Sequence, residues 1–340
     1  MLGAKTSMQN AERLKKFLLH KKLLHTGYLA KQEGSSVLFP LRGKFTDKRF
    51  RVKFVQAVFP PSLLEKKSMK EVLLKALTER EKAFLRRGFD TMGDIALIDV
   101  PKELQSKEKL IAETILSLHK NIRTVLKKKG IHAGTFRLQP LQYLAGEKKK
   151  EALYKENGVV MKLNVEKVYF SPRLANERKR IASLVKPRER VLVMFSGCAP
   201  YPLVIARHSQ AKEITGIELN PAAHMYAEQN AALNKAKHVQ LIHGDVRKIV
   251  PQLKKTYERI CMPLPKGAEN FLTEAFLVSK KGTIIHFYDF LHEKDFPQKA
   301  IEKIERAARK NKKKIKILNH IRCGEYAPHV YRVCVDFAVL

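Results

Sequence analysis

The 340-residue sequence contains no tryptophan, and aromatic residues make up only 8% of it. An aromatic platform that stacks single-stranded bases is therefore not expected. The four cysteines form no C-x-x-C pair, which argues against a zinc site and against a disulfide framework. The 12 histidines form no ligand-like cluster with cysteine or aspartate along the sequence, so we expect no metal.

Long apolar segments are also missing. The longest apolar runs, at 95–98 and 191–195, are far shorter than the roughly 20 residues that cross a bilayer. The N-terminal stretch is charged and amphipathic, unlike the apolar block of a signal peptide. A hydrophobic content of 44% and this length allow two or three domains with real cores. We expect a cytoplasmic protein with no membrane partner.

Acidic residues are few, with 33 Asp and Glu against 67 Lys and Arg, which gives a net charge of +34. Such an excess destabilises a compact chain unless a polyanion relieves it. Nucleic acid is the favoured partner, because phosphate contacts release counterions. The alternative interpretation is a lysine-rich, well-solvated surface.

Residues 1–60 form the first of three regions that differ in pattern, with 13 basic and 3 acidic residues. Apolar residues recur at helical spacing over 11–18, residues 37–41 are typical of a strand, and apolar and basic residues alternate over 50–54. We expect a small independent module here. A basic, helical linker is expected over 61–88.

The middle region, residues 89–185, is expected to be an α+β domain. A strand is predicted over 94–100, and Pro101 opens a helix after it. The Asn157-Gly158 pair between two apolar stretches is a strong hairpin signal.

The last region, residues 186–340, alternates strands, turns and helices. This rhythm predicts a mostly parallel sheet flanked by helices. Strands are predicted at 191–195, 213–217, 239–243, 259–262, 283–287 and 330–337, with helices at 221–234 and 267–276.

The loops that follow these strands are candidates for a ligand site, since ligands bind at the carboxyl ends of such strands. Gly197 after the first strand lets backbone approach a ligand, and Glu218 after the second can accept hydrogen bonds from ribose hydroxyls. Asp245 after the third suits an adenine amino group. Any of these alone fits an ordinary turn, but together they favour an adenosine-bearing cofactor. The stiff Pro263-Leu264-Pro265 loop is either a plain connection or a wall of that site.

Motifs along essentially the whole chain support a more specific interpretation. Residues 169–174 read Tyr-Phe-Ser-Pro-Arg-Leu and are followed by Glu177-Arg178. Further motifs lie at 89–94, 143–147, 154–158 and 326–328. Together they resemble the archaeal and eukaryotic tRNA (guanine-37 N1)-methyltransferase family.

The resemblance implies a Rossmann-like class I methyltransferase domain with a mostly parallel sheet, preceded by two smaller α+β domains. S-adenosylmethionine is then the cofactor. The partner is tRNA, whose outer corner is held by the N-terminal module and whose anticodon loop is held by the other two domains. We expect the protein to be a monomer.

The resemblance also implies roles for individual residues. Glu177 acts as the general base that removes the proton from guanine N1, and Arg137 stabilises the negative charge that spreads to O6. Pro265 completes the catalytic group, and Tyr169 and Arg173 bind the substrate. The implied cofactor contacts are Arg178, Gly197, Glu218, Leu219, Asp245, Val246 and Pro263.

Glu177 has another interpretation when it is judged by its neighbours alone. It follows Arg173 by four residues and precedes Arg180 by three, which is the spacing of ion pairs on a helix surface. The residues alone therefore favour an exposed, ion-paired helix acid, whereas the resemblance favours a base.

Three positions depart from the family pattern. Val193 stands where the first strand usually ends in Asp, Ala199 replaces a second glycine, and Pro263 replaces an Asn. The lost hydrogen bonds leave open a tRNA-binding protein with weakened or lost catalysis. A second rival is the sister activity that uses the same cofactor, the aminocarboxypropyl transferase of wybutosine synthesis. Retention of Glu177 and Arg137 favours methyl transfer.

Overall fold

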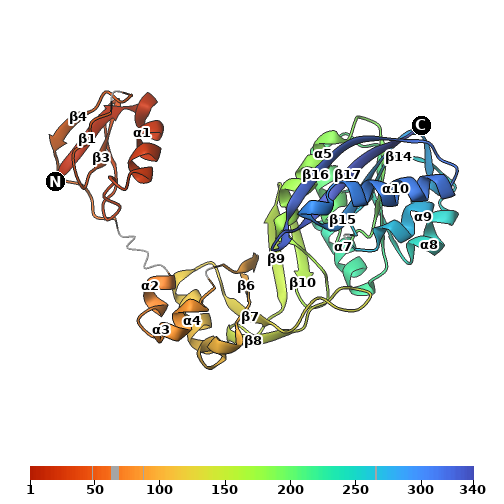
Figure 1. Cartoon of the computed structure of the whole chain (residues 1–340), viewed down its shortest axis with the longest axis horizontal. Coiled ribbons are helices and arrows are strands. Elements are labelled where there is room, and N and C mark those ends of the chain that lie inside the picture. Colours follow the sequence, from red (N-terminus) through yellow and green to blue (C-terminus); the bar gives the residue numbers. More distant parts are fainter. Residues whose placement is uncertain (48, 63–68, 87, 265) are drawn as a thin grey trace. The chain divides into compact units, whose positions relative to one another are not determined.

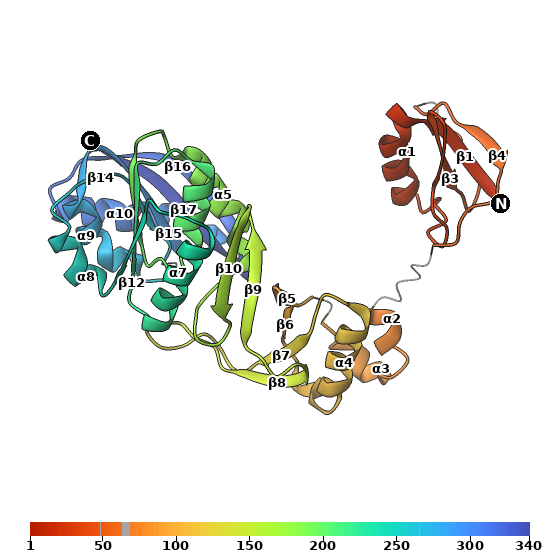
Figure 2. The ribbon, with the colours of Figure 1, turned by 180° about the vertical axis from the view of Figure 1, so that it is seen from behind.

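The computed structural model describes residues 1–47, 49–62, 69–86, 88–264 and 266–340. The chain divides into two compact units, Met1–Val72 and Leu73–Leu340, which Figures 1 and 2 show from opposite sides. Across the described ranges, no helix is both long and apolar enough to cross a membrane.

The first unit is built on a four-stranded antiparallel sheet in the order β2-β3-β1-β4. The helix α1 (Met8–His20) packs Leu14 and Leu18 into a core with Ala4 and Phe39. The strands are β1 (Leu2–Ser7), β2 (Lys31–Glu33), β3 (Ser36–Pro40) and β4 (Lys53–Gln56).

The strand predicted over 50–54 is correct only at its end, because β4 begins at Lys53. Phe50 instead packs its ring against Phe17 of α1, with the ring centroids 4.9 Å apart. An aromatic pair at this separation contributes about 0.5–1.5 kcal/mol beyond the burial of its area.

The second unit contains a smaller mixed sheet in the order β5-β6-β7-β8. The helix α4 (Glu108–Leu118) buries Ile111 and Ile115 and packs against β7 and β8. Two short helices, α2 (Met69–Leu73) and α3 (Glu79–Ala83), lie in the stretch predicted as a helical linker. The strands are β5 (Asp90–Met92), β6 (Ile95–Ile98), β7 (Thr124–Lys128) and β8 (Leu141–Gly146).

The hairpin predicted at Asn157-Gly158 is confirmed by β9 (Glu151–Glu156) and β10 (Val159–Asn164). Both turn residues have positive φ, at 44° and 72°, as a two-residue hairpin turn requires. Two asparagine side chains, Asn230 within α7 (Pro221–Leu233) and Asn234 at its C-terminal cap, hydrogen-bond to the hairpin. Asn234 Oδ1 accepts from the Val160 amide at 2.9 Å, and Asn230 Oδ1 accepts from the Lys162 amide at 2.7 Å.

The large sheet has seven strands in the order β13-β12-β11-β14-β15-β17-β16, of which the first five are parallel. Val191 and Val193 of β11 face one core, whereas Leu192 and Met194 face the other. Burial on both faces explains the continuous apolar runs. The strands are β11 (Arg190–Met194), β12 (Glu213–Glu218), β13 (Val239–His243), β14 (Tyr257–Met262), β15 (Ser279–His292), β16 (Ile315–Ala327) and β17 (Val330–Val339).

Helices cover both faces of this sheet (Figures 1 and 2). Side chains of α5 (Ala175–Leu184), α6 (Pro200–His208) and α7 belong to the core of the first face. Side chains of α8 (Val246–Ile249), α9 (Leu272–Leu277) and α10 (Gln298–Lys310) belong to the core of the second. The mostly parallel α/β architecture predicted from the sequence is confirmed.

One strand of the sheet, β16, was not predicted. It lies at the edge and pairs with β17 through several register shifts. Many of its side chains are polar and exposed, as is common for edge strands, so the sequence lacks the apolar run by which the other strands were found.

Candidate active site

Four loops at the carboxyl ends of the parallel strands enclose a cavity of about 290 Å³. Gly197, Asp245 and Pro263 lie in the loops after β11, β13 and β14, Glu218 is the last residue of β12, and all four line this first cavity. Parallel strands end at the same edge of a sheet, which is why residues far apart in sequence meet here. Leu219, Val246 and Arg178 line it as well.

Glu218 ties two of these loops together. Its carboxylate accepts from the Gly197 amide at 2.7 Å and from the Asn220 amide at 2.8 Å. Burial raises the pKa of Glu218, although these backbone donors oppose the shift. Each carboxylate oxygen keeps a lone pair, so Glu218 can still accept from two ligand hydroxyls.

The loop after β11 has a tight backbone. Phe195, Gly197 and Ala199 have positive φ values of 61°, 58° and 69°. Ala199 stands at the position of the family's second glycine and holds a left-handed conformation that costs about 1 kcal/mol in a residue with a side chain. The backbone at position 199 thus keeps the left-handed conformation that favours glycine, although the residue is alanine.

The lining of the first cavity fits an adenosine-bearing group. Phe195, Leu264 and Phe271 supply apolar walls for a ring. Ser196 also lines the cavity, and its buried hydroxyl has no hydrogen-bond partner among the described residues. An unpaired buried polar atom beside an apolar wall and a carboxylate is the environment that a ribose or adenine can complete.

Arg178 is buried beside this cavity, with 2% of its surface exposed. Its Nε and Nη2 donate to the two oxygens of Glu156 at 2.5 Å each, and Nη2 also donates to the Ser171 carbonyl at 3.1 Å. The paired guanidinium therefore fixes the segment that begins α5.

A second cavity, of about 530 Å³, is lined by basic side chains from distant parts of the second unit. Lys128 donates to Asp90 at 2.6 Å, and Arg173 donates to the same carboxylate at 2.9 and 3.0 Å. Burial, together with Lys128 and two arginines, lowers the pKa of His132. The carboxylates of Asp90, Asp99 and Glu325 line it too, and Arg86 pairs with Asp99. The basic residues that line the cavity are Arg86, Lys128, His132, Arg137, Arg173 and Arg332, which outnumber the acids.

The two cavities share a wall. Arg137, Tyr169, Phe170 and Ser171 line both of them. Arg137 has a φ of 52°, and its guanidinium donates to the Lys266 carbonyl. The Tyr169 hydroxyl accepts from Arg332 at 2.8 Å. A group bound in the first cavity would therefore face a group bound in the second across Arg137 and Tyr169.

Glu177 lines neither cavity in this structure, although it belongs to the same helix, α5, as Arg178. It is 5% exposed, and its carboxylate accepts from Arg180 Nε and Nη2 at 2.8 Å each. The Tyr288 hydroxyl also donates to it at 2.5 Å. The pairing with Arg180 agrees with the helix spacing, but the predicted exposure of Glu177 is wrong, and Arg173 pairs with Asp90 instead.

The remaining departures from the family pattern lie in different environments. Val193 is fully buried in the core of the first face and lines neither cavity, whereas Pro263 lines the first cavity. Pro265, the third residue of the predicted catalytic group, lies outside the described residues.

The expectation that no histidine clusters with cysteine or aspartate is wrong in space. Ligand atoms of His286, Cys334 and Asp336 lie within 4.8 Å of one another. Arg259 donates to His286 and Arg180 donates to Asp336, so two guanidinium cations already occupy this cluster. Their charge disfavours a further cation.

Arg332 was missed by sequence reasoning. It is 8% exposed, lines the second cavity, and its Nε has no partner among the described residues. The available signal was a charged residue inside the apolar run of β17. Asp336 in the same strand carries the same signal.

The fold is that of a Rossmann-like α/β domain, and its strand-end cavity, which fits an adenosine-bearing group, adjoins a second cavity lined by several basic side chains. Residues 152–318 match the TRM5/TYW2 methyltransferase domain, and residues 69–149 match the TYW2 N-terminal domain. The chain belongs to the TRM5/TYW2 methyltransferase family.

Two curated relatives illustrate the range of this family. The tRNA (guanine(37)-N(1))-methyltransferase Trm5b of Pyrococcus abyssi is 35% identical, over 99% of this chain and 99% of that protein. The tRNA(Phe) (4-demethylwyosine(37)-C(7)) aminocarboxypropyltransferase of Pyrococcus horikoshii is 31% identical, over 81% of this chain and 97% of that protein.

Two solved structures are similar over the whole chain. The complex of aTrm5 with tRNALeu has a TM-score of 0.72 at 28% identity, covering 100% of both chains. Trm5 of Methanocaldococcus jannaschii in complex with adenosine has a TM-score of 0.66 at 28% identity, covering 100% of this chain and 99% of that one.

Proposed function

We propose that this chain is a tRNA (guanine-37 N1)-methyltransferase that uses S-adenosylmethionine. The single observation that carries the proposal is the wall shared by the two cavities, formed by Arg137 and residues 169–171. It gives a methyl donor and an acceptor base adjoining sites. The full-length similarity to Trm5b supports the same activity.

The first cavity is the proposed cofactor site. S-adenosylmethionine supplies a methyl group made electrophilic by a sulfonium. Glu218 accepts from the ribose hydroxyls, Asp245 accepts from the adenine amino group, and the apolar walls enclose the ring. Arg178 holds Ser171 at the edge of the cavity through its backbone carbonyl.

The second cavity is the proposed site of the target nucleotide in the anticodon loop. Its basic lining attracts phosphate, and Arg173 and Tyr169 contact the substrate. The net charge of +34 supports a polyanionic partner, and residues 1–60 are proposed to hold the outer corner of the tRNA.

The proposed chemistry needs a base and a stabiliser. Glu177 takes the N1 proton of guanine, and the N1 electron pair then accepts the methyl group. Arg137 lies in the shared wall, from which it can donate to O6 as negative charge builds there. Because Glu177 lines neither cavity, its carboxylate can take this role only after it exchanges the Tyr288 hydroxyl for guanine N1.

The predicted organisation is kept as part of the proposal. It comprises the module 1–60, the linker 61–88, the middle domain 89–185 and the catalytic domain 186–340. We propose that the protein acts as a monomer in the cytoplasm.

A direct assay tests the proposed function. Purified protein is incubated with methyl-labelled S-adenosylmethionine and a tRNA transcript that carries G at position 37, with a matched A37 transcript as control. Nucleoside mass spectrometry is expected to find 1-methylguanosine only with G37. In a parallel incubation with tRNA that carries the wybutosine precursor at position 37, an aminocarboxypropyl product, with no 1-methylguanosine on the G37 transcript, would replace the proposal with the rival transfer. Binding of tRNA without any product would indicate lapsed catalysis.

A further inference from the structure

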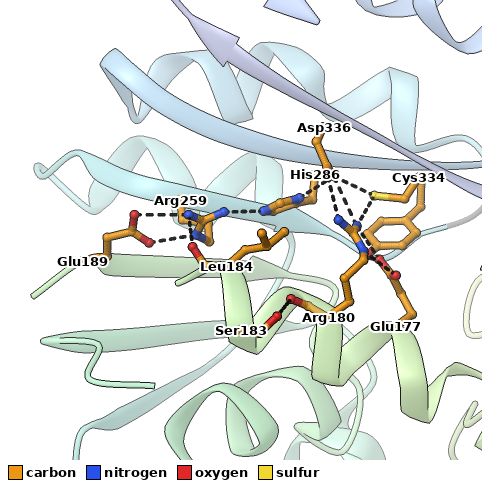
Figure 3. Close-up of polar contacts among 10 residues, drawn as sticks. Glu177, Arg180, Ser183, Leu184, Glu189, Arg259, His286, Cys334 and Asp336 are labelled. Atoms are coloured by element: carbon orange, nitrogen blue, oxygen red, sulfur yellow. Dashed lines mark hydrogen bonds and ion pairs between the residues drawn. The ribbon is translucent and has the colours of Figure 1, made fainter. Parts of the chain in front are cut away.

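A network of charged side chains, joined by one histidine, runs through the interior of the second unit and ends at Glu177 (Figure 3). At its far end, Glu189 accepts from Arg259 at 2.7 and 3.2 Å. Arg259 Nη1 in turn lies 2.8 Å from Nε2 of His286. Glu189 directly precedes β11, Arg259 lies on β14 and His286 lies on β15.

The near end of the network centres on Arg180. Its Nη1 donates to Asp336 Oδ2 at 2.7 Å, while Nε and Nη2 donate to the two oxygens of Glu177. Asp336 and His286 stand directly opposite each other in the β15–β17 register, and His286 Nδ1 lies 2.6 Å from Asp336 Oδ1. Figure 3 shows Arg180 reaching both carboxylates.

The proton positions on His286 follow from its partners. A guanidinium only donates, so Arg259 requires Nε2 of His286 to accept, and Nδ1 must carry the proton that is donated to Asp336. Burial lowers the pKa of His286 despite the bond to Asp336, which raises it, and the charges of Arg259 and Arg180 act in the same direction as burial. His286 is therefore a neutral spacer with a fixed tautomer.

This network of buried side chains has one negative charge in excess, because the three carboxylates of Glu177, Glu189 and Asp336 face two guanidinium groups. Although burial opposes it, the bonds from His286 and Arg180 lower the pKa of Asp336. Among the described residues, Glu189 pairs with Arg259 only, whereas Glu177 shares Arg180 with Asp336. A proton accepted by Glu177 would make this buried network of side chains neutral.

We propose that Asp336 and His286 are positioning residues for methyl transfer: they fix Arg180 so that it holds the Glu177 carboxylate ionised and oriented. The inference rests on the proposed function, because it assumes that Glu177 is the base. It adds two residues that are distant in sequence and line neither cavity. Asp336 lies 156 positions after Arg180, and His286 lies 109 positions after Glu177.

Other groups near Glu177 do not change this assignment. Burial raises the pKa of each neighbouring thiol and phenol, so these groups are neutral near pH 7. Arg178 is neutralised by Glu156. The neutral neighbours are Tyr201 on α6, Cys261 on β14, Tyr288 on β15, Cys323 on β16 and Cys334 on β17.

The test compares Asp336→Asn with a matched control, Asp289→Asn. Asp289 is an equally buried carboxylate on β15, and it pairs with Lys303 at 2.6 Å rather than with the network that ends at Glu177. Single-turnover methyl transfer to a G37 transcript is measured at saturating tRNA and cofactor. We expect Asp336→Asn to slow it by about tenfold or more, with both dissociation constants unchanged, and Asp289→Asn to leave it near wild type.

The pH profile gives a second readout that a purely structural loss would not produce. Asn at 336 removes one of the two carboxylates that share Arg180, so the attraction of that guanidinium falls on the Glu177 carboxylate alone. The acid limb of the rate profile should then move to lower pH, and the plateau should fall because the base is weaker. If Asp336→Asn does not fold, His286→Gln, which keeps an N–H donor, should retain more activity than His286→Phe.

A double-mutant cycle separates this inference from the proposed function. If Asp336 acts through Glu177, Asp336→Asn should have no further effect on the rate in a Glu177→Gln background. The same fold-loss in both backgrounds, or a pH profile like that of Asp289→Asn, would overturn the inference. An unchanged rate in Glu177→Gln alone would instead reject Glu177 as the base.

Discussion

Val193 provides the sharpest test of whether the departures from the family pattern are compensated. Restoring an aspartate there would return a carboxylate to the end of β11, and by family resemblance alone it should improve the cofactor site. Val193 is fully buried and lines neither cavity, and its neighbours on the adjacent strands are Gly216 and Cys261. We therefore expect Val193→Asp to destabilise the protein.

The magnitude follows from the cost of keeping a buried carboxyl neutral. Each pH unit above the unfolded-state pKa of about 3.9 adds about 1.36 kcal/mol. The pH-dependent part of the loss for Val193→Asp is then up to about 4 kcal/mol at pH 7 and about 1.5 kcal/mol at pH 5. Because the folded-state pKa is raised, the loss appears above about pH 3.9 and grows with pH until that raised pKa is reached.

The assay is urea unfolding of wild type, Val193→Asp and Val193→Asn between pH 5 and pH 7. The asparagine variant has the same shape and no titrating proton, so its loss should not depend on pH in this range. A loss for Val193→Asp that matched Val193→Asn at every pH would refute the argument from desolvation. Tighter cofactor binding with full stability at pH 7 would show that the strand end still accepts the family's carboxylate.

Four further predictions concern the proposed sites. Glu177→Gln should leave tRNA binding intact and slow single-turnover methyl transfer by about 10²–10⁴-fold, because only proton removal is lost; an unchanged rate would argue against the base. Glu218→Gln should weaken S-adenosylmethionine binding in calorimetric titration, since two backbone amides and the ribose hydroxyls then compete for one carbonyl oxygen, and unchanged affinity would place the ribose elsewhere. Pro263→Asn, at a residue that lines the first cavity, should tighten the same binding by about 1 kcal/mol, and no change would mean that its neighbours already satisfy the cofactor. Deletion of residues 1–60 should flatten the salt dependence of tRNA binding, because 13 of the basic residues are removed, and an identical slope would show that this module makes no phosphate contacts.

The sequence alone determined the frame of the cofactor site. Apolar runs separated by helical stretches specified a parallel sheet, and topology then required the loops after its strands to meet at one edge. Gly197, Glu218 and Asp245 could be placed there because each lies at the carboxyl end of its strand or within three residues of it. Family resemblance, which depends on local motifs, supplied the roles that spacing left open.

Only the tertiary structure decided the surroundings of Glu177. Its helix spacing predicted a pairing with Arg180, but burial and the contact with Tyr288 depend on how α5 packs against β15. The link from Arg180 to Asp336 joins residues 156 positions apart, and the opposition of Asp336 to His286 is set by strand register. Register between distant strands is fixed by side-chain packing in the whole sheet, so neither a motif nor a periodicity in the sequence reveals it.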